Sequence, residues 1–329
     1  MIKKIMDYFD ISKTRLTIPK LWEKDWDALI EETDKEMRVL PEAQKRIAAL
    51  FKDIDDNSFT FGRAAWLCLT TRLFNIINAV VGACHSNSDL LFDVLQRITL
   101  EYWFQVYTMA LESQDKRRDY LNAYAAWSLD CDLMYQKYLL KPSVMDGIWD
   151  IEEEKEYIES SEEEKLIREK LFGPTNTEKL TADYHEAQKR KMDHKSEEYK
   201  KRDRIKEWLK HEDIKPWTER INKIRRNRRN PNLSFYELFD KSQTSFYQKI
   251  KSKELSDKDL EFLYAEYKKS SMKIHGSSFL DNFTVNSKIL FPKILGDSDS
   301  NTEKAILIGS MATSLILPLL FLKKAVWSK

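Results

Sequence analysis

Glycine and proline are scarce in this sequence, which has only seven glycines and eight prolines in 329 residues. Hairpins and the tight turns between strands and helices depend on these two residue types, so their scarcity predicts a helical chain. No two glycines lie within ten residues of each other. This removes the glycine-rich loops that cradle phosphates in dinucleotide-binding and P-loop proteins, and the function classes built on those loops are therefore excluded.

Cysteine is rarer still, with three residues in the chain. Cys68, Cys84 and Cys131 each lie in a stretch with helical apolar spacing, and they are not spaced as metal ligands. This pattern favours buried free thiols in a reducing compartment over disulfides or a zinc site. The first ten residues also contain no apolar stretch long enough for a secretory signal. We therefore expect a cytoplasmic protein with no metal and no other cofactor.

An excess of charge of one sign is also missing, because 55 lysines and arginines balance 54 acids. The charges are nevertheless segregated along the chain. Residues 151–170 hold nine acids and four bases, a net of −5, whereas residues 184–229 hold 17 bases and nine acids, a net of +8. These charge-rich stretches, broken at Gly173, predict two or three solvated helices inserted as an arm between more apolar parts of the chain.

Several stretches outside the arm have the apolar spacing of helices. Before it they are residues 21–53, with a break at Pro41, residues 61–84, apolar nearly all round, residues 89–110 and residues 115–140; after it they are residues 233–250 and 257–274. The segment 61–84 is expected at the centre of the bundle. We therefore predict an all-α fold: a helical bundle with its N-terminal half in residues 1–148, a charged arm in 149–230 and its C-terminal half in 231–329.

A terminal apolar run, residues 305–322, has 18 residues without a charge. A helix that crosses a bilayer needs about 20 apolar residues, so a membrane anchor is one interpretation. Gly309 and Ser310 are small residues that suit close helix packing, and Lys323 and Lys324 would have to cross the bilayer. Both facts favour a buried core helix, and with it cytoplasmic location over membrane association.

Arg97 and Glu101 are the most informative pair, one helical turn apart in an apolar and aromatic helix. Burying a guanidinium and a carboxylate is costly unless they satisfy each other. The pair is therefore either an intrahelical ion pair that ties neighbouring helices together or part of a polar site. Tyr120 and Tyr264 are either core aromatics or side chains that line such a site.

His275 ends a predicted helix and precedes Gly276, which suits the position after a helix. It is either a C-terminal cap, where the helix dipole stabilises an imidazolium, or a proton carrier, because histidine titrates near neutral pH. If the helices that hold Arg97, Glu101 and His275 face one another, a cation, a carboxylate and a titratable base meet. That set suits cleavage of a phosphodiester without a metal ion.

The arm ends in four arginines, Arg225, Arg226, Arg228 and Arg229, and aromatic residues are interleaved with its other bases. Positive charge combined with aromatic rings fits binding to the phosphates and bases of RNA. The alternative is a solvated helical face that pairs with the acids of residues 152–169.

Three short motifs resemble a bacterial family catalogued as domain-of-unknown-function 5677. They are an Arg-x3-Glu helix, here Arg97 to Glu101; a segment ending in tyrosine, here Arg117-Arg118-Asp119-Tyr120; and a tyrosine-rich helix with serine and a final histidine, here Tyr264 through Ser271 to His275. The resemblance covers roughly residues 61–140 and 232–278, and the arm lies outside it. The family has no firmly assigned activity.

The helical layout of that family is similar to that of HEPN proteins, many of which are metal-independent ribonucleases of toxin and antiviral defence systems. Their usual site has an arginine four to six residues before a histidine. Lys268, Lys269 and Ser270 occupy those positions ahead of His275, so the motif is incomplete. A lysine supplies charge but not the planar fork of arginine, and Arg97 from another helix is the candidate substitute.

The resemblance implies an RNA-binding or RNA-cleaving protein, an endoribonuclease if it is an enzyme. His275 is the expected acid or base, Arg97 the phosphate ligand and Glu101 the residue that orients Arg97. Tyr120, Tyr264, Lys268, Lys269 and the four arginines at the end of the arm are the expected binding residues. The alternative is a non-enzymatic effector that uses the arm for a protein partner, such as the product of a neighbouring gene, and the terminal helix for a membrane or a homodimer contact.

Overall fold

The computed structural model describes residues 14–54, 58–84, 89–141, 158–173, 177–226, 233–239, 261–265, 267, 283–286, 289–292 and 298–327. Helices dominate this part of the chain, and the all-α class predicted from the sequence is confirmed. One short antiparallel hairpin departs from it, in which β1 (Phe283–Asn286) pairs with β2 (Ile289–Pro292). The sequence analysis predicted no strands there.

The chain divides into two compact units. One contains Ala126–Thr218, and the other contains Asp10–Ala125 and Glu219–Lys329. The helices α6 (Gln114–Leu139) and α11 (Lys215–Arg226) each contribute residues to both units. The domain limits expected from the charge pattern, near residues 149 and 230, stay a prediction.

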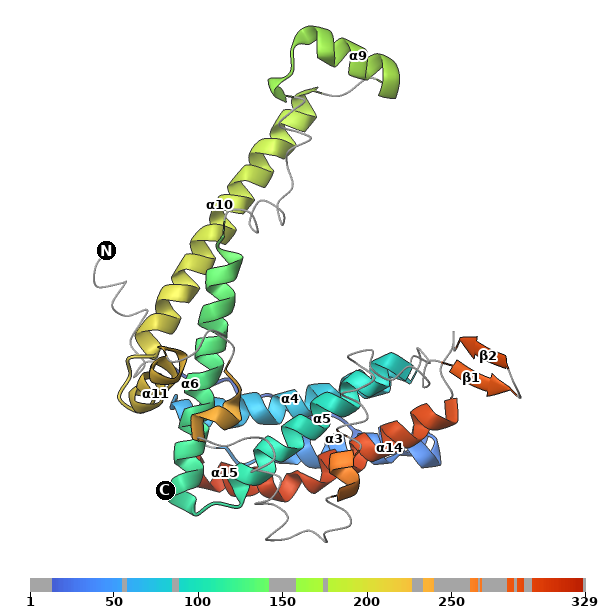
Figure 1. Cartoon of the computed structure of the whole chain (residues 1–329), viewed down its shortest axis with the longest axis vertical. Coiled ribbons are helices and arrows are strands. Elements are labelled where there is room, and N and C mark those ends of the chain that lie inside the picture. The colour runs from blue at the N-terminus through green and yellow to red at the C-terminus, as the bar shows by residue number, and fades with distance from the viewer. Residues whose placement is uncertain are drawn as a thin grey trace. The chain divides into compact units, whose positions relative to one another are not determined.

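The larger unit is built around a helical bundle. Its helices are α3 (Val39–Ala49), α4 (Phe61–Ala83), α5 (Asp89–Ala110), α14 (Ser298–Ser314) and α15 (Ile316–Trp327). The helix α14 packs against α3, α4 and α5, and α15 packs against α4 and α5. Figure 1 shows the C-terminal helices, in red, alongside the blue and cyan helices from the first third of the chain. Both ends of the chain therefore build one core, as predicted for a bundle interrupted by an insertion.

The helix α4 has the predicted bounds but is not buried all round. Its inward side holds large apolar residues, among them Trp66, Leu69 and Leu73, which are fully buried. A stripe along its other side is exposed and consists of Cys68, Arg72, Asn75, Ala79 and Gly82. These positions recur every three or four residues, so they share one face of the helix. The expectation of a central helix is wrong on this face.

The break expected at Pro41 lies earlier in the chain. The segment after residue 20 forms η2 (Leu21–Glu23), α2 (Trp26–Glu32) and η3 (Lys35–Met37), and α3 then begins at Val39. Pro41 therefore lies in the first turn of α3, where a backbone N–H has no partner within the helix. A proline is tolerated there, so it marks the start of a helix and not its end.

The C-terminal apolar run forms two helices. Leu315 separates α14 from α15, and Pro318 follows in the first turn of α15. Proline has no N–H for a carbonyl one turn earlier, which accounts for the break. The Trp66 indole donates a 2.8 Å hydrogen bond to the Leu319 carbonyl, and Trp103 donates to the Ser314 hydroxyl at 2.8 Å. These bonds fasten both helices to the bundle.

Close packing of α14 depends on Gly309, as its small size predicted. A Cβ atom at this position would lie 3.0 Å from Val39 Cγ1 and 3.1 Å from Leu40 Cδ2, at the start of α3. Contacts this short leave no room for a larger side chain without displacement of α3. Gly309 therefore sets the distance between the two helices.

Two segments, Phe61–Ala83 and Asn301–Trp327, have the length and apolar composition of membrane-crossing helices, and about half of each is buried inside the protein. Core helices of soluble proteins share these properties, so the observation is weak evidence for a membrane. The choice between core helix and anchor stays a prediction.

Three helices account for the described part of the arm: α9 (Glu162–Phe172), α10 (Thr177–Trp208) and α11. Ser161 and Glu164 form a reciprocal capping box at the start of α9, and Gly173, with φ 94°, ends it. That left-handed conformation favours glycine, which explains why the chain breaks there. The prediction of two or three helices in this stretch is confirmed.

The two helices predicted after the arm are described only in part. Residues 235–239 form the 3-10 helix η4 (Phe235–Phe239), and residues 261–265 and 267 are helical. The rest of the expected helices 233–250 and 257–274 lies outside the described residues.

Candidate functional site

A row of polar side chains runs along one side of α5. Asp93, Arg97, Glu101 and Gln105 follow one another at four-residue intervals, so they lie on neighbouring turns of one face. Asp93 and Gln105 are buried, with 5% and 6% exposure. The Arg97 side chain is 20% exposed and that of Glu101 44% exposed. The row therefore opens to solvent at its middle, at the pair that the sequence singled out.

The Arg97 guanidinium has two neighbours of different chemistry. Its Nη2 atom lies 3.8 Å from Glu101 Oε2, and its central carbon lies 3.7 Å from the centre of the Tyr267 ring. The first is an ion pair too long for a hydrogen bond, and the second is a cation–π contact. The predicted intrahelical ion pair is thus confirmed. The two contacts together hold the plane of the guanidinium.

The hydrogen-bonding capacity of Arg97 is not used up. Its Nη1 atom is buried and has no hydrogen-bond partner among the described residues. An unmet donor on a charged group is costly when it is buried, so it is a place where an anion or a water molecule is favoured. A carboxylate or a phosphate oxygen suits such a donor best, because both pair well with guanidinium.

Tyrosines from two other segments surround the pair. Tyr236, in η4, lies close to the Glu101 carbonyl, with its hydroxyl 3.4 Å away, and is 4% exposed. Burial raises the pKa of Tyr236 well above its ordinary value, and the negative charge of Glu101 adds to that effect. The phenol therefore stays neutral. The ring of Tyr264 is stacked on that of Tyr267 at 6.2 Å, so Tyr264 joins the cluster as predicted.

A second ion pair closes the row at the start of α5. Lys304 Nζ of α14 lies 2.9 Å from Asp93 Oδ1, and the two side chains are 12% and 7% exposed. No local pattern relates two residues so far apart in the chain, and the sequence analysis missed both. A polar residue every fourth position from Asp93 to Gln105 was the signal that could have extended the site along α5.

The remaining predicted site residues fall into two groups. Tyr120 lies elsewhere in the larger unit, stacked on Phe239 at 4.2 Å, with its hydroxyl 3.4 Å from Glu112. Arg225 and Arg226 lie in the last turn of α11, where Arg226 is exposed. The other predicted residues lie outside the described residues; they are His275, Lys268, Lys269, Arg228 and Arg229. The separation of His275 from Arg97 therefore stays a prediction.

All three cysteines are free, but the prediction that they are buried is wrong. Cys68, Cys84 and Cys131 are exposed. Each lies on a helix whose sequence is apolar overall, yet each falls on the side that faces solvent. Within the described part of the chain, no three histidine, cysteine or acidic side chains lie close enough together to hold a metal ion.

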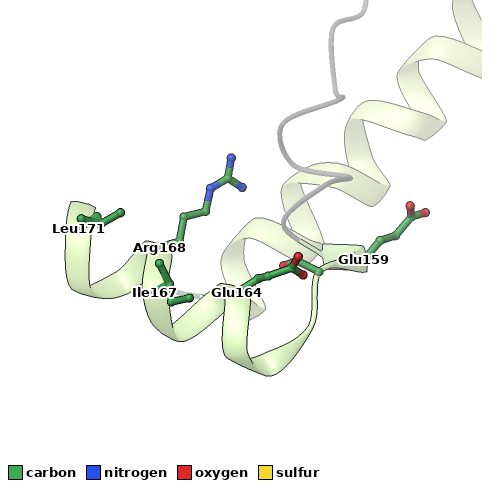
Figure 2. A pocket seen from close by; sticks show the side chains of 6 residues that line it. Glu159, Glu164, Ile167, Arg168 and Leu171 are labelled. Atoms are coloured by element: carbon green, nitrogen blue, oxygen red, sulfur yellow. The ribbon is translucent and has the colours of Figure 1, made fainter.

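Two hollows lie away from the α5 cluster. One of about 520 Å³ is formed by α9 and the residues before it and is lined by Glu159, Ser160, Glu164, Ile167, Arg168 and Leu171 (Figure 2). Another of about 410 Å³ lies among α2, α3 and the end of α4. Ile167 and Leu171 are 58% and 71% exposed. The first hollow is therefore an open surface of mixed character.

Comparison of the chain with protein families, with curated proteins and with solved structures found no match. The resemblance to the domain-of-unknown-function 5677 family and to HEPN proteins stays a prediction.

Proposed function

We propose that this chain binds RNA, with the α5 cluster as the place where a phosphodiester is held, and that it cleaves RNA without a metal ion in the manner of HEPN proteins. A bacterial defence or toxin system in the cytoplasm is the proposed setting. The observation that carries the proposal is the Arg97 guanidinium, held by Glu101 and Tyr267 and left with an unmet donor. A fixed cation of this kind suits a phosphate.

In the proposed reaction the ribose 2′ hydroxyl attacks phosphorus, the bond to the 5′ oxygen breaks, and a 2′,3′ cyclic phosphate forms. One base takes the proton of the 2′ hydroxyl and one acid returns a proton to the 5′ oxygen. His275 performs one of these transfers. Arg97 binds the phosphate oxygens whose charge grows in the transition state, and Glu101 orients Arg97.

Cleavage of total RNA or transfer RNA in the presence of a chelator tests this proposal. The wild type should cleave, His275→Ala should lose activity, and Arg97→Lys should lose most of it because lysine lacks the planar fork. Arg190→Ala is the matched control, since Arg190 pairs with Glu186 one turn earlier on an exposed helical surface. Equal activity of wild type and His275→Ala, or no cleavage by the wild type, would discard the enzymatic proposal.

A second candidate is a non-enzymatic effector, with the arm bound to a protein partner and the C-terminal helices in contact with a membrane or a second copy. The exposed aliphatic residues of α9 favour it, because Leu166, Ile167 and Leu171 are 55%, 58% and 71% exposed. Contiguous exposed apolar side chains often mark interaction surfaces. Recovery of the protein without detergent as a monomer would remove the membrane and homodimer forms of this candidate.

A further inference from the structure

Two tyrosines near the end of α6 extend into solvent. Tyr135 and Tyr138 are 59% and 57% exposed, although tyrosine rings are usually packed against other apolar groups. They are three residues apart on the helix, so their side chains are neighbours on one face. Two rings thus stand beside each other on an open surface.

The charge around these rings is positive. Lys137 lies between them and is exposed, and Lys141 Nζ lies 5.0 Å from the centre of the Tyr138 ring. From Leu133 to Lys141 the sequence contains two lysines and no acid. A polyanion therefore meets favourable charge along this turn of the chain, whereas an acidic ligand without rings would leave both tyrosines unused.

The same pairing of ring and cation recurs on α10, which belongs to the same compact unit as this part of α6. The Arg202 guanidinium lies 4.6 Å from the centre of the Tyr199 ring, and Tyr199 is 37% exposed. Exposed rings beside cations are the features with which proteins bind single-stranded nucleic acid: the bases stack on the rings and the cations hold the phosphates.

We propose that Tyr135 and Tyr138 form a stacking platform for the bases of single-stranded RNA, with Lys137 and Lys141 bound to the flanking phosphates. This inference rests on the proposed RNA binding and adds a substrate class to it. Bases in a duplex are stacked on each other and cannot reach the rings, so the platform selects single strands. It also gives RNA a contact outside the α5 cluster.

The test measures binding of a fluorescent 12-nucleotide oligoadenylate to the full chain. Tyr135→Ala with Tyr138→Ala should weaken binding about tenfold or more, because each stacked base contributes strongly to affinity. Tyr135→Phe with Tyr138→Phe should bind as the wild type does, since phenylalanine keeps the ring. A duplex of the same length should bind more weakly, and the alanine pair should not change its affinity.

A matched control comes from α9. Leu166→Ala with Ile167→Ala removes two side chains of nearly the same exposure, 55% and 58%, from the same unit. These changes should leave binding of the oligoadenylate unchanged. An equal loss from this pair, or a loss in the phenylalanine variant, would overturn the platform because neither change removes a ring.

Salt dependence separates the roles of ring and cation. Lys137→Gln and Lys141→Gln should each reduce the slope of log affinity against log salt by about 0.7, whereas the tyrosine variants should keep the wild-type slope. All four residues are exposed or lie at a helix end, so the variants should fold.

The outcomes distinguish this inference from the proposed function. If the wild type does not bind the oligonucleotide, RNA binding and the platform both fall. If it binds and the alanine pair binds equally well, the platform alone is overturned and RNA binding stands. Binding of a protein partner to this surface, with RNA affinity unchanged by the alanine pair, would overturn it as well.

Discussion

Two long helices of this chain, α5 and α10, treat charge in opposite ways. On α5, Asp93 is buried against Lys304 and Arg97 is mostly covered by its neighbours. On α10, Lys206 and Asp203 form an ion pair 3.3 Å long whose side chains are 43% and 52% exposed. The lengths of the two ion pairs are similar, but their surroundings are not.

The difference shows that the number of charges in a segment says little about their energetic weight. Exposed pairs such as those of α10 contribute about 0–1 kcal/mol, because water and salt screen them. A buried charge is costly once its partner is removed, by about 3–5 kcal/mol. The few charges of α5 should therefore matter more to stability than the many charges of α10.

Removal of Lys304 is the strongest test of this comparison. Lys304→Met should lower the free energy of unfolding by about 3 kcal/mol or more, because the Asp93 carboxylate would be left buried without its cation. Lys206→Met makes the same substitution on α10 and should change it by about 0.5 kcal/mol or less. Urea unfolding of both variants measures the difference.

Replacing both partners distinguishes loss of a pair from loss of packing. Asp93→Leu combined with Lys304→Met should recover most of the stability lost by the single variant, because no charge remains buried. Equal losses in the Lys304 and Lys206 variants would contradict the contrast between the helices.

Gly309 sharpens the comparison with respect to packing. Gly309→Leu should destabilise the protein by about 1–3 kcal/mol, since the side chain would collide with Val39 and Leu40 of α3. Gly82, on the exposed stripe of α4, has open space where a Cβ atom would lie, with nothing within 4 Å. Gly82→Ala should therefore stabilise the helix by up to about 1 kcal/mol. Thermal unfolding of the two variants should shift in opposite directions.

Local patterns in the sequence were enough to predict much of this fold. The long apolar helices α4 and α6 begin and end within about a residue of the predicted bounds, because helical periodicity is strong over twenty residues or more. The Arg97–Glu101 ion pair was also predictable, since it depends only on residues one turn apart.

Contacts between distant segments could not be predicted in the same way. The pairing of Asp93 with Lys304 and the contact of Tyr267 with Arg97 depend on how helices pack, which no local pattern records. The exposure of Cys68 has a similar cause. The sequence of α4 is apolar enough for burial on every side, but the helices packed against it leave one stripe open.

Alkaline pH provides a smaller test of the α5 surroundings. Burial raises the pKa of Tyr102 and of Tyr236 above the ordinary value near 10. Above that pH the unfolded chain loses these protons while the folded chain keeps them, so stability present below pH 10 falls as the pH rises. Each group contributes a slope of up to about 1.4 kcal/mol per pH unit.

Tyr236→Phe should make this decline shallower, because the variant has no proton to lose at that position. Its unfolding free energy near neutral pH should fall by about 1 kcal/mol or less, since the hydroxyl makes only a long contact with the Glu101 carbonyl. Unfolding curves at pH 8 and at pH 10.5 measure the slope. A wild-type slope in the variant would mean that Tyr236 ionises as easily in the folded protein as in the unfolded chain.

The smallest expected effect concerns Cys84, at the end of α4. Burial raises the pKa of its thiol despite the exposure of the residue as a whole, and the sulfur lies 3.1 Å from the Val80 carbonyl. Because the thiolate is the reactive form, alkylation of Cys84 at pH 8 should be slower in the folded protein than in urea. A chain with Cys68→Ser and Cys131→Ser isolates this thiol. The pH at which its reaction rate is half maximal should lie higher in the folded state; an equal or lower midpoint would show that the end of α4 is more open than its packing indicates.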